Sequence, residues 1–260
     1  MTLTDHLQPL LDKRFPAALV AILVSIAPAL AGDHLEPEDS IYSGVAPFQP
    51  GYDRAMVASF ADAFKADVEA SAIVQPSFEP EFAVGVKQDA DGYRIFYQEA
   101  SQQLWQYSVL EMMKRGEITS ADANGKSTTA EDIAKLEKSL PPNPKDVKIN
   151  RCEYAIDSDL GAKIVDDWRR MLLGTRYAKR PRMGIDGTFY HFFAKSGYQG
   201  MAGKTWSPDP ATATGMLAQL ADSMKTLCTT KRDLTLREVE KLTGALASKL
   251  GADPGNAHDD

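Results

Sequence analysis

The sequence has little of what metal and redox sites are usually built from, with two cysteines and four histidines among 260 residues. It contains no C-x-x-C pair and no H-E-x-x-H motif, the clustered spacings that zinc sites require. The G-x-S-x-G context of a serine nucleophile is missing as well. We therefore expect no bound metal and no organic cofactor.

Positive charge is also scarce. The chain has 29 Lys and Arg residues against 36 Asp and Glu residues, a formal net charge of −7. An acidic chain without a basic stripe is a poor match for nucleic acid or an anionic membrane surface. These two classes of partner are therefore not expected, and the oligomeric state is left open by composition.

The one long uncharged run is Phe15–Ala31, and it follows Lys13 and Arg14 directly. A basic start, an apolar run and the small-residue end Ala29-Leu30-Ala31 are the order of a secretory signal peptide. The run is shorter than the ~20 residues that a membrane-spanning helix needs. We predict a signal peptide over residues 1–31, cleaved near Ala31, and a periplasmic or secreted protein. The alternative is a retained membrane anchor.

The two cysteines, Cys152 and Cys228, both follow the predicted signal peptide. Two thiols in an oxidising compartment favour one disulfide, which would close a loop worth ~4 kcal/mol on the chain-entropy account. Two separate buried thiols are the alternative.

The first half of the chain is predicted to contain one helix and one hairpin. Residues 32–51 are expected to be an irregular lead-in, and a helix is expected at 53–70 because Met56, Phe60, Phe64 and Val68 recur every fourth residue. The segment 76–81 contains two prolines and should turn. Alternating apolar residues at 82–86 and 93–97 flank Asp91-Gly92, which predicts a β-hairpin.

The middle of the chain gives weaker signals. Residues 102–113 fit a strand or a short helix. Residues 116–146 are polar and are expected to form an inserted loop, in which Thr128-x-x-Glu131 could cap a short helix.

The second half is expected to contain both strands and helices. The expected elements are a strand at 147–152, a helix from Asp157 or Ser158 through Leu172, a hairpin of 183–185 with 188–194 across Asp186-Gly187, a strand at 201–206, a helix at 211–228, and a last helix opened by a Thr235-x-x-Glu238 capping box.

Helices and hairpins are segregated rather than alternating regularly. This order predicts an α+β fold, with an antiparallel sheet built from hairpins and packed against several amphipathic helices. The domain should span 52–250, and the tail at 251–260 should be flexible.

Four strings resemble a group of uncharacterised exported bacterial proteins, in the same order, over about residues 50–229. They are Pro76-Ser77-Phe78-Glu79-Pro80-Glu81, Trp168-x-x-Met171-Leu172 with Thr175-Arg176-Tyr177, Asp186-Gly187-x-x-Tyr190-His191-Phe192, and Ala202-Gly203-x-Thr205-Trp206-Ser207-Pro208. The last helix and 116–146 resemble additions to that group. The resemblance implies an exported soluble domain and assigns no catalytic residue.

His191 is the candidate catalytic residue, because imidazole titrates near neutral pH and can act as a general base. It lies in the aromatic run 189–193, where alternation places Phe189, His191 and Phe193 on one face. A nucleophile for it would have to be a loop serine or a free cysteine. The alternative is a packed histidine with a purely structural role.

Paired carboxylates at Glu79 and Glu81, and at Asp166 and Asp167, have the residue types of glycosidase chemistry. They are interpreted as solvated surface groups.

The binding surface is predicted from an aromatic, glycine-rich segment and the basic residues before it. Its residues are Tyr198, Lys204, Trp206, Arg180 and Arg182. The leading hypothesis is a non-enzymatic exported domain that binds another envelope or secreted protein, as an antagonist, an immunity-like protein or an envelope accessory. The alternatives are an envelope hydrolase using His191, and small-ligand binding in an aromatic-lined cleft.

Overall fold

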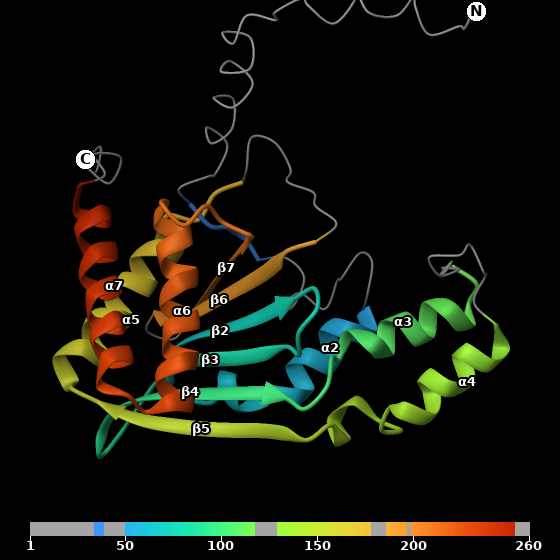
Figure 1. Ribbon diagram of the computed structural model, residues 1–260. Helices are drawn as coiled ribbons and strands as arrows, with labels where there is room; N and C mark the ends of the chain where they lie inside the picture. Colours follow the sequence, from blue (N-terminus) through green and yellow to red (C-terminus); the bar gives the residue numbers. More distant parts are fainter. Residues whose placement is uncertain (1–33, 39–49, 118–128, 178–185, 197–198, 253–260) are drawn as a thin grey trace, which may run out of the picture. The chain divides into compact units, whose positions relative to one another are not determined.

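A seven-stranded antiparallel sheet with the strand order β1-β7-β6-β2-β3-β4-β5 forms the centre of the structure (Figure 1). The computed structural model describes residues 34–38, 50–117, 129–177, 186–196 and 199–252. The strands are β1 (Glu36–Pro37), β2 (Val68–Pro76), β3 (Phe82–Asp89), β4 (Gly92–Ala100), β5 (Ile149–Ile156), β6 (Thr188–Ser196) and β7 (Gln199–Trp206).

Helices lie against both faces of this sheet, and the buried side chains form two separate hydrophobic clusters. The helices are α2 (Pro50–Ser59), α3 (Trp105–Lys114), α4 (Ala130–Ser139), α5 (Ser158–Leu173), α6 (Ala213–Thr230) and α7 (Asp233–Ala252), with short 3-10 turns η1 (Ala61–Phe64) and η2 (Pro144–Asp146). Neighbouring side chains in one strand go to opposite clusters: Phe192 packs with α5 and α6, whereas Phe193 packs with α2 and η1. The predicted α+β class is confirmed.

Several local predictions are confirmed because the deciding signal lies within a few residues. The β3–β4 hairpin turns between Asp89 and Gly92, and Gly92 has φ +114°, which favours glycine. Asp157 caps α5 by accepting a hydrogen bond from the backbone N–H of Asp159. Residues 102–113, left open between strand and helix, contribute to α3.

The helix predicted at 53–70 is wrong beyond its first turns. α2 ends at Ser59, η1 ends at Phe64, and Val68 begins β2. The side chains of Met56, Phe60, Phe64 and Val68 do pack in one cluster, but three different elements bring them there. The chain from Val68 becomes a strand because β3 and β6 pair with it on both sides, and this tertiary pairing overrides the local pattern.

The hairpin of 183–185 with 188–194 is also wrong, because β2 and β7 occupy both edges of β6. Residues 183–185 themselves lie outside the described residues. The hairpin partner of β6 is β7, the strand predicted at 201–206.

The starts of two helices and the N-terminal lead-in differ from the predictions in smaller ways. The capping box of α4 is formed by Thr129 and Asp132, one residue beyond the predicted pair, and Thr128 lies outside the described residues. α7 begins at Asp233, so Thr235 lies inside its first turn rather than capping it. The lead-in is regular in part, because β1 pairs with β7 and Leu35 is fully buried.

Cys152 and Cys228 form the predicted disulfide, which joins the middle of β5 to the last turn of α6. The predicted signal peptide and residues 253–260 lie outside the described residues. Of the helices in the described part of the chain, none has the length and hydropathy needed to cross a membrane.

Reducing this disulfide should lower the free energy of unfolding by about 2–5 kcal/mol, because the bond closes a long loop in the unfolded chain. Urea denaturation with and without reductant measures the difference. A Cys152→Ser/Cys228→Ser variant should have the stability of the reduced protein and be insensitive to reductant. Equal stability of the oxidised and reduced protein would contradict the expectation.

Candidate functional site

The strings that begin at Pro76 and at Asp186, more than a hundred residues apart, meet at one end of the sheet. Ser77 donates from its backbone N–H to the carbonyl of Gly187 at 3.0 Å and from its hydroxyl to the same oxygen at 2.7 Å. The Ser77 Oγ accepts from the N–H of Gly187 at 2.9 Å. These reciprocal bonds fix the start of the loop between β2 and β3.

The string that ends at Pro208 joins the same end. Ser207 donates from its N–H to the carbonyl of Thr188 at 2.8 Å, and its Oγ accepts from the Thr188 N–H at 2.9 Å. A Cβ placed on Gly187 would lie 2.6 Å from the indole ring of Trp206, so only glycine fits beneath that ring. Trp168, from the remaining string, packs edge-on against Phe192 with ring centroids 5.4 Å apart. The four strings thus form one contiguous region.

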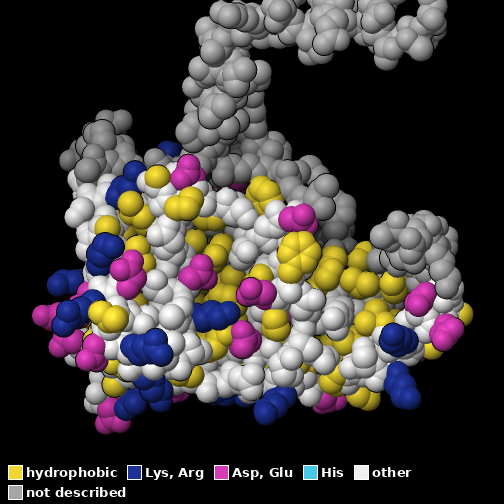
Figure 2. Space-filling model, viewed as in Figure 1, with side chains coloured by type: hydrophobic (Ala, Val, Ile, Leu, Met, Phe, Trp, Pro, Cys, Tyr) yellow, Lys and Arg dark blue, Asp and Glu magenta, His cyan; other side chains and the backbone are white. Residues whose placement is uncertain are grey.

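A groove of about 450 Å³ opens beside this region, between α6 and the ends of β2, β3 and β6. Phe78 stands at its rim with 77% of its surface exposed. Tyr190 donates from its hydroxyl to Asp222 at 2.9 Å, and burial raises the pKa of the Asp222 carboxyl. Lys225 lies 4.3 Å from the centre of the Phe82 ring and 3.4 Å from Glu99. Figure 2 shows hydrophobic side chains exposed among acidic and basic ones on the face viewed.

A second cavity of about 610 Å³ lies on the η1 side of the sheet. Phe64, Phe193, Met201 and small side chains form most of its lining, and Lys65 and Lys195 are the cations beside them. The Phe64 and Phe193 rings contact each other at 5.3 Å between centroids. This cavity matches an apolar ligand better than a charged one.

His191 is a buried residue, with 4% of its surface exposed. Its Nδ1 pairs with the carboxylate of Glu38, which is itself fully buried, and its Nε2 lies 3.2 Å from Gln75 Oε1. Both ring nitrogens therefore contact protein oxygens. As alternation predicts, Phe193 lies on the same face and Phe192 on the other.

The ring nitrogens of His191 contact Glu38 and Gln75, so neither of them contacts a serine or cysteine side chain. Both cysteines are in the disulfide, which excludes the cysteine option. The Ser207 hydroxyl is used by the Thr188 backbone. Within the described ranges, no group of three His, Cys, Asp or Glu side chains could hold a metal ion.

Two of the four carboxylates interpreted as solvated are buried, so that interpretation is wrong for Glu81 and Asp167. Glu81 is fully buried and accepts hydrogen bonds from the Tyr52 hydroxyl at 2.7 Å and from the backbone N–H groups of Leu104 and Trp105 at 2.7 and 2.9 Å. It satisfies N–H groups at the start of α3 that have no partner within the helix, a contact across 23 residues that no local pattern indicates.

Asp167 is 2% exposed, with Arg170 at 3.5 Å. Its Oδ2 has no hydrogen-bond partner among the described residues. Burial raises the pKa of its carboxyl to about 6. Its neighbour Asp166 is exposed, as is Glu79, in agreement with the sequence interpretation.

The predicted binding surface is only partly visible. Lys204 and Trp206 lie two residues apart on β7, and both are half-buried. They lie directly across from His191 and Phe189 of β6, so they share the face of the sheet that carries His191. Tyr198, Arg180 and Arg182 lie outside the described residues. The structure therefore places two of the five residues on one strand and adds Phe78, which the sequence interpretation passed over.

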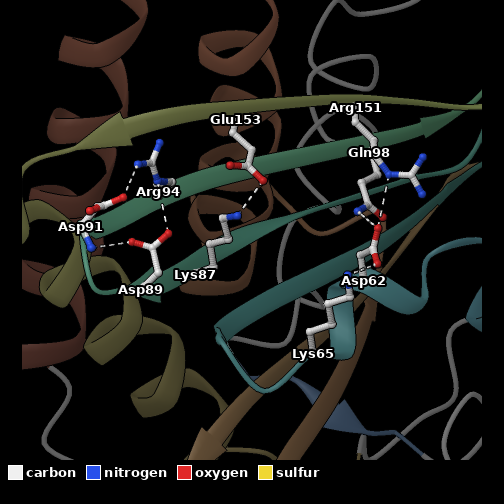
Figure 3. Close-up of polar contacts among 9 residues, drawn as sticks. All are labelled: Asp62, Lys65, Lys87, Asp89, Asp91, Arg94, Gln98, Arg151 and Glu153. Atoms are coloured by element: carbon white, nitrogen blue, oxygen red, sulfur yellow. Dashed lines mark hydrogen bonds and ion pairs between the residues drawn. The ribbon is translucent and has the colours of Figure 1, made fainter.

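Charged side chains cover the η1 side of β3, β4 and β5 (Figure 3). Lys87 pairs with Glu153 at 2.6 Å, and Asp62 contacts Arg151 at 3.3 Å and Lys65 at 2.7 Å. The hydrogen bond from Lys65 lowers the pKa of Asp62, with a further contribution from Arg151. Such pairs, in contact with water, add little stability, but they fix the pattern of charge on this face.

No family model matches the sequence, no curated protein matches it, and no solved structure matches the fold.

The His191–Glu38 pair should act as a structural unit. Removing either side chain leaves a buried polar partner, which should cost about 3 kcal/mol of unfolding free energy. The double variant Glu38→Ala/His191→Ala should lose at least about 1 kcal/mol less than the sum of the single variants. Chemical denaturation of the four proteins measures this coupling, and strict additivity would rule it out.

Asp167 should make stability depend on pH. Its folded pKa of about 6 lies above the ordinary aspartate pKa of 3.8, so the folded state binds the proton more tightly between these values. Stability from this group is complete below the unfolded pKa and is lost as pH rises through 6. The free energy of unfolding of Asp167→Asn, relative to that of the wild type, should therefore rise between pH 4 and pH 8, by up to about 3 kcal/mol. Asp166→Asn is the control, and parallel pH profiles of all three proteins would disprove the assignment.

Proposed function

We propose that the chain is an exported, non-enzymatic protein that binds another envelope or secreted protein, in an antagonist, immunity-like or accessory role. The apolar run at Phe15–Ala31 supports export, and the Cys152–Cys228 disulfide is compatible with an oxidising compartment. We infer that the compartment is the periplasm or the external medium.

The observation that carries the proposal is the presentation of Phe78. Its side chain is 77% exposed, although an aromatic ring of this size stabilises a fold only when it is buried. The loop that holds it is fixed by the reciprocal hydrogen bonds between Ser77 and Gly187. Because the loop is ordered before binding, little conformational entropy is lost when a partner covers the ring.

The groove beside Phe78 supplies the polar contacts that an interface needs around an aromatic anchor. Its acidic groups are Glu79 and Asp222, and Lys225 is a cation on the same wall. We infer that the partner inserts an apolar side chain next to Phe78 and places a polar or basic group near the two carboxylates.

The hydrolase alternative has less support. His191 is covered, and its two nitrogens contact Glu38 and Gln75, so neither nitrogen is positioned toward a substrate. A general base must reach the proton it removes. The buried pair supports a structural role for His191 instead.

Binding of a small apolar ligand is a second candidate, and the 610 Å³ cavity next to Phe64 and Phe193 is the observation that favours it. Its volume is within the usual range of ligand sites. Such a ligand would raise the melting temperature, and Phe78→Ser would leave that shift unchanged.

Phe78→Ser should remove partner binding without unfolding the protein. Leu234→Ser is the matched control, because Leu234 on α7 is 76% exposed and lies on another element. Both substitutions should change the free energy of unfolding by less than about 0.5 kcal/mol. In cross-linked co-purification from the producing cells, the partner should be recovered with wild type and Leu234→Ser. Recovery should fall at least about tenfold with Phe78→Ser, which corresponds to a loss of about 1.4 kcal/mol of binding free energy. Equal recovery with both variants, or no partner with any protein, would overturn the proposal.

A further inference from the structure

The strand β5 lies at the border of the sheet. It pairs with β4 from Ile149 to Ile156 and ends the strand order on that side. Figure 1 shows β5 along the lower border of the sheet, and the three helices α5, α6 and α7 are drawn above it. A strand in this position presents a row of backbone groups that can pair with another strand.

The register determines which backbone groups point outward. Ser101 donates its N–H to the carbonyl of Lys148 at 2.8 Å, which makes these two residues a hydrogen-bonded pair. Such pairs alternate along an antiparallel ladder, so the even-numbered residues of β5 bond to β4. The N–H and C=O groups of Ile149, Arg151, Glu153 and Ala155 therefore point away from the sheet. One of them, the Ile149 carbonyl, accepts from the Arg151 guanidinium at 3.3 Å.

The side chains along this edge match a second copy of the same strand. In two antiparallel copies of β5 related by a two-fold axis, the outward-pointing residues of one copy must lie opposite those of the other. Because these residues are all odd-numbered, the axis must lie at a residue position, where that residue faces its own copy. An axis at Arg151 or at Glu153 would set like charges face to face. An axis at Cys152 places Arg151 of each copy opposite Glu153 of the other, and pairs Ile149 with Ala155.

The neighbouring charges continue this match on both sides. Arg151 and Glu153 lie on the same face of β5, as Figure 3 shows. Within one copy, Arg151 contacts Asp62, and Glu153 contacts Lys87. Across the axis the order becomes Asp62, Arg151, then Glu153 and Lys87 of the second copy, so that acidic and basic groups alternate through the interface. Opposite charges directly across a ladder are stabilising, and like charges are destabilising.

We propose that the chain forms a symmetric dimer in which β5 pairs with β5 of a second copy, antiparallel about an axis at Cys152, so that one sheet continues through both copies. This goes beyond the binding function proposed above and does not depend on it. The side chain of Cys152 points to the opposite face, where the disulfide to Cys228 holds it away from the charged pairs.

Single and combined charge reversals test the register directly. Arg151→Glu alone would place two acidic side chains opposite each other at both contacts, and Glu153→Arg alone would place two basic ones there. Each variant alone should dimerise at least about tenfold more weakly than wild type at low ionic strength. A mixture of the two should regain the wild-type affinity, because each contact then joins opposite charges. Sedimentation of one labelled variant, with and without the other, measures this.

Two controls separate the interface from the fold. Ala155→Pro removes an outward N–H that β4 does not use, so it should abolish the dimer and keep the circular dichroism of the wild type. Lys241→Glu, on the exposed part of α7, should leave dimerisation unchanged. A wild type that stays monomeric at about 100 µM, a weak-binding threshold, would overturn the proposal. So would single variants that dimerise like the wild type, or a mixture that forms no mixed dimers.

Discussion

The pairing of β2 with β3 on one side and β6 on the other holds this structure together. β3 comes from the same half of the chain, whereas β6 comes from the other half, more than a hundred residues later. Because Pro76 lies opposite Thr188 in this register, the loop that starts at Ser77 reaches Gly187. A shift of the register by one residue would reverse the faces of β2 and separate these loops. The position of Phe78 therefore depends on a strand pairing in the middle of the sheet.

Helices pack over parts of both faces of the sheet, and this explains why ionisable side chains are found inside the protein. Glu81 is satisfied by backbone N–H groups at the start of α3, and Glu38 by His191. A buried charge is tolerated when a partner or several hydrogen bonds compensate for lost hydration. Asp167 has less compensation, and burial raises the pKa of its carboxyl as a result. These groups stabilise or perturb the fold, and they are not gathered around one cavity.

The two proposed contact surfaces are separate in the sheet. The loop with Phe78 follows β2, whereas β5 lies three strands away, about 14 Å at the usual spacing between strands. Pairing through β5 would leave both Phe78 loops accessible and fix the distance between them. A dimer with two such loops would bind a repetitive or dimeric partner with higher avidity than a single copy.

Much of the local structure could be predicted from the sequence, because each signal lies within a short window. Alternation around Asp91-Gly92 predicted the β3–β4 hairpin, the apolar periodicity predicted α5 and α6, and the count of two cysteines predicted the disulfide. The boundaries of the elements were predicted less accurately, as the early end of α2 at Ser59 shows. There the local pattern fits a helix, and the hydrogen bonds of β2 to two other strands decide otherwise.

The candidate site was predicted only in part. Sequence patterns identified the segments around Pro76, Asp186 and Trp206, but not that Ser77, Gly187 and Ser207 bind one another. They placed His191 on the correct face, but only the tertiary structure put Glu38 beside it. Burial of a polar side chain depends on elements that pack over it from elsewhere in the chain. The sequence by itself determined the local elements and the chemistry available. The three-dimensional pairing decided which of those groups are buried, which are exposed, and which strand edge is left to pair.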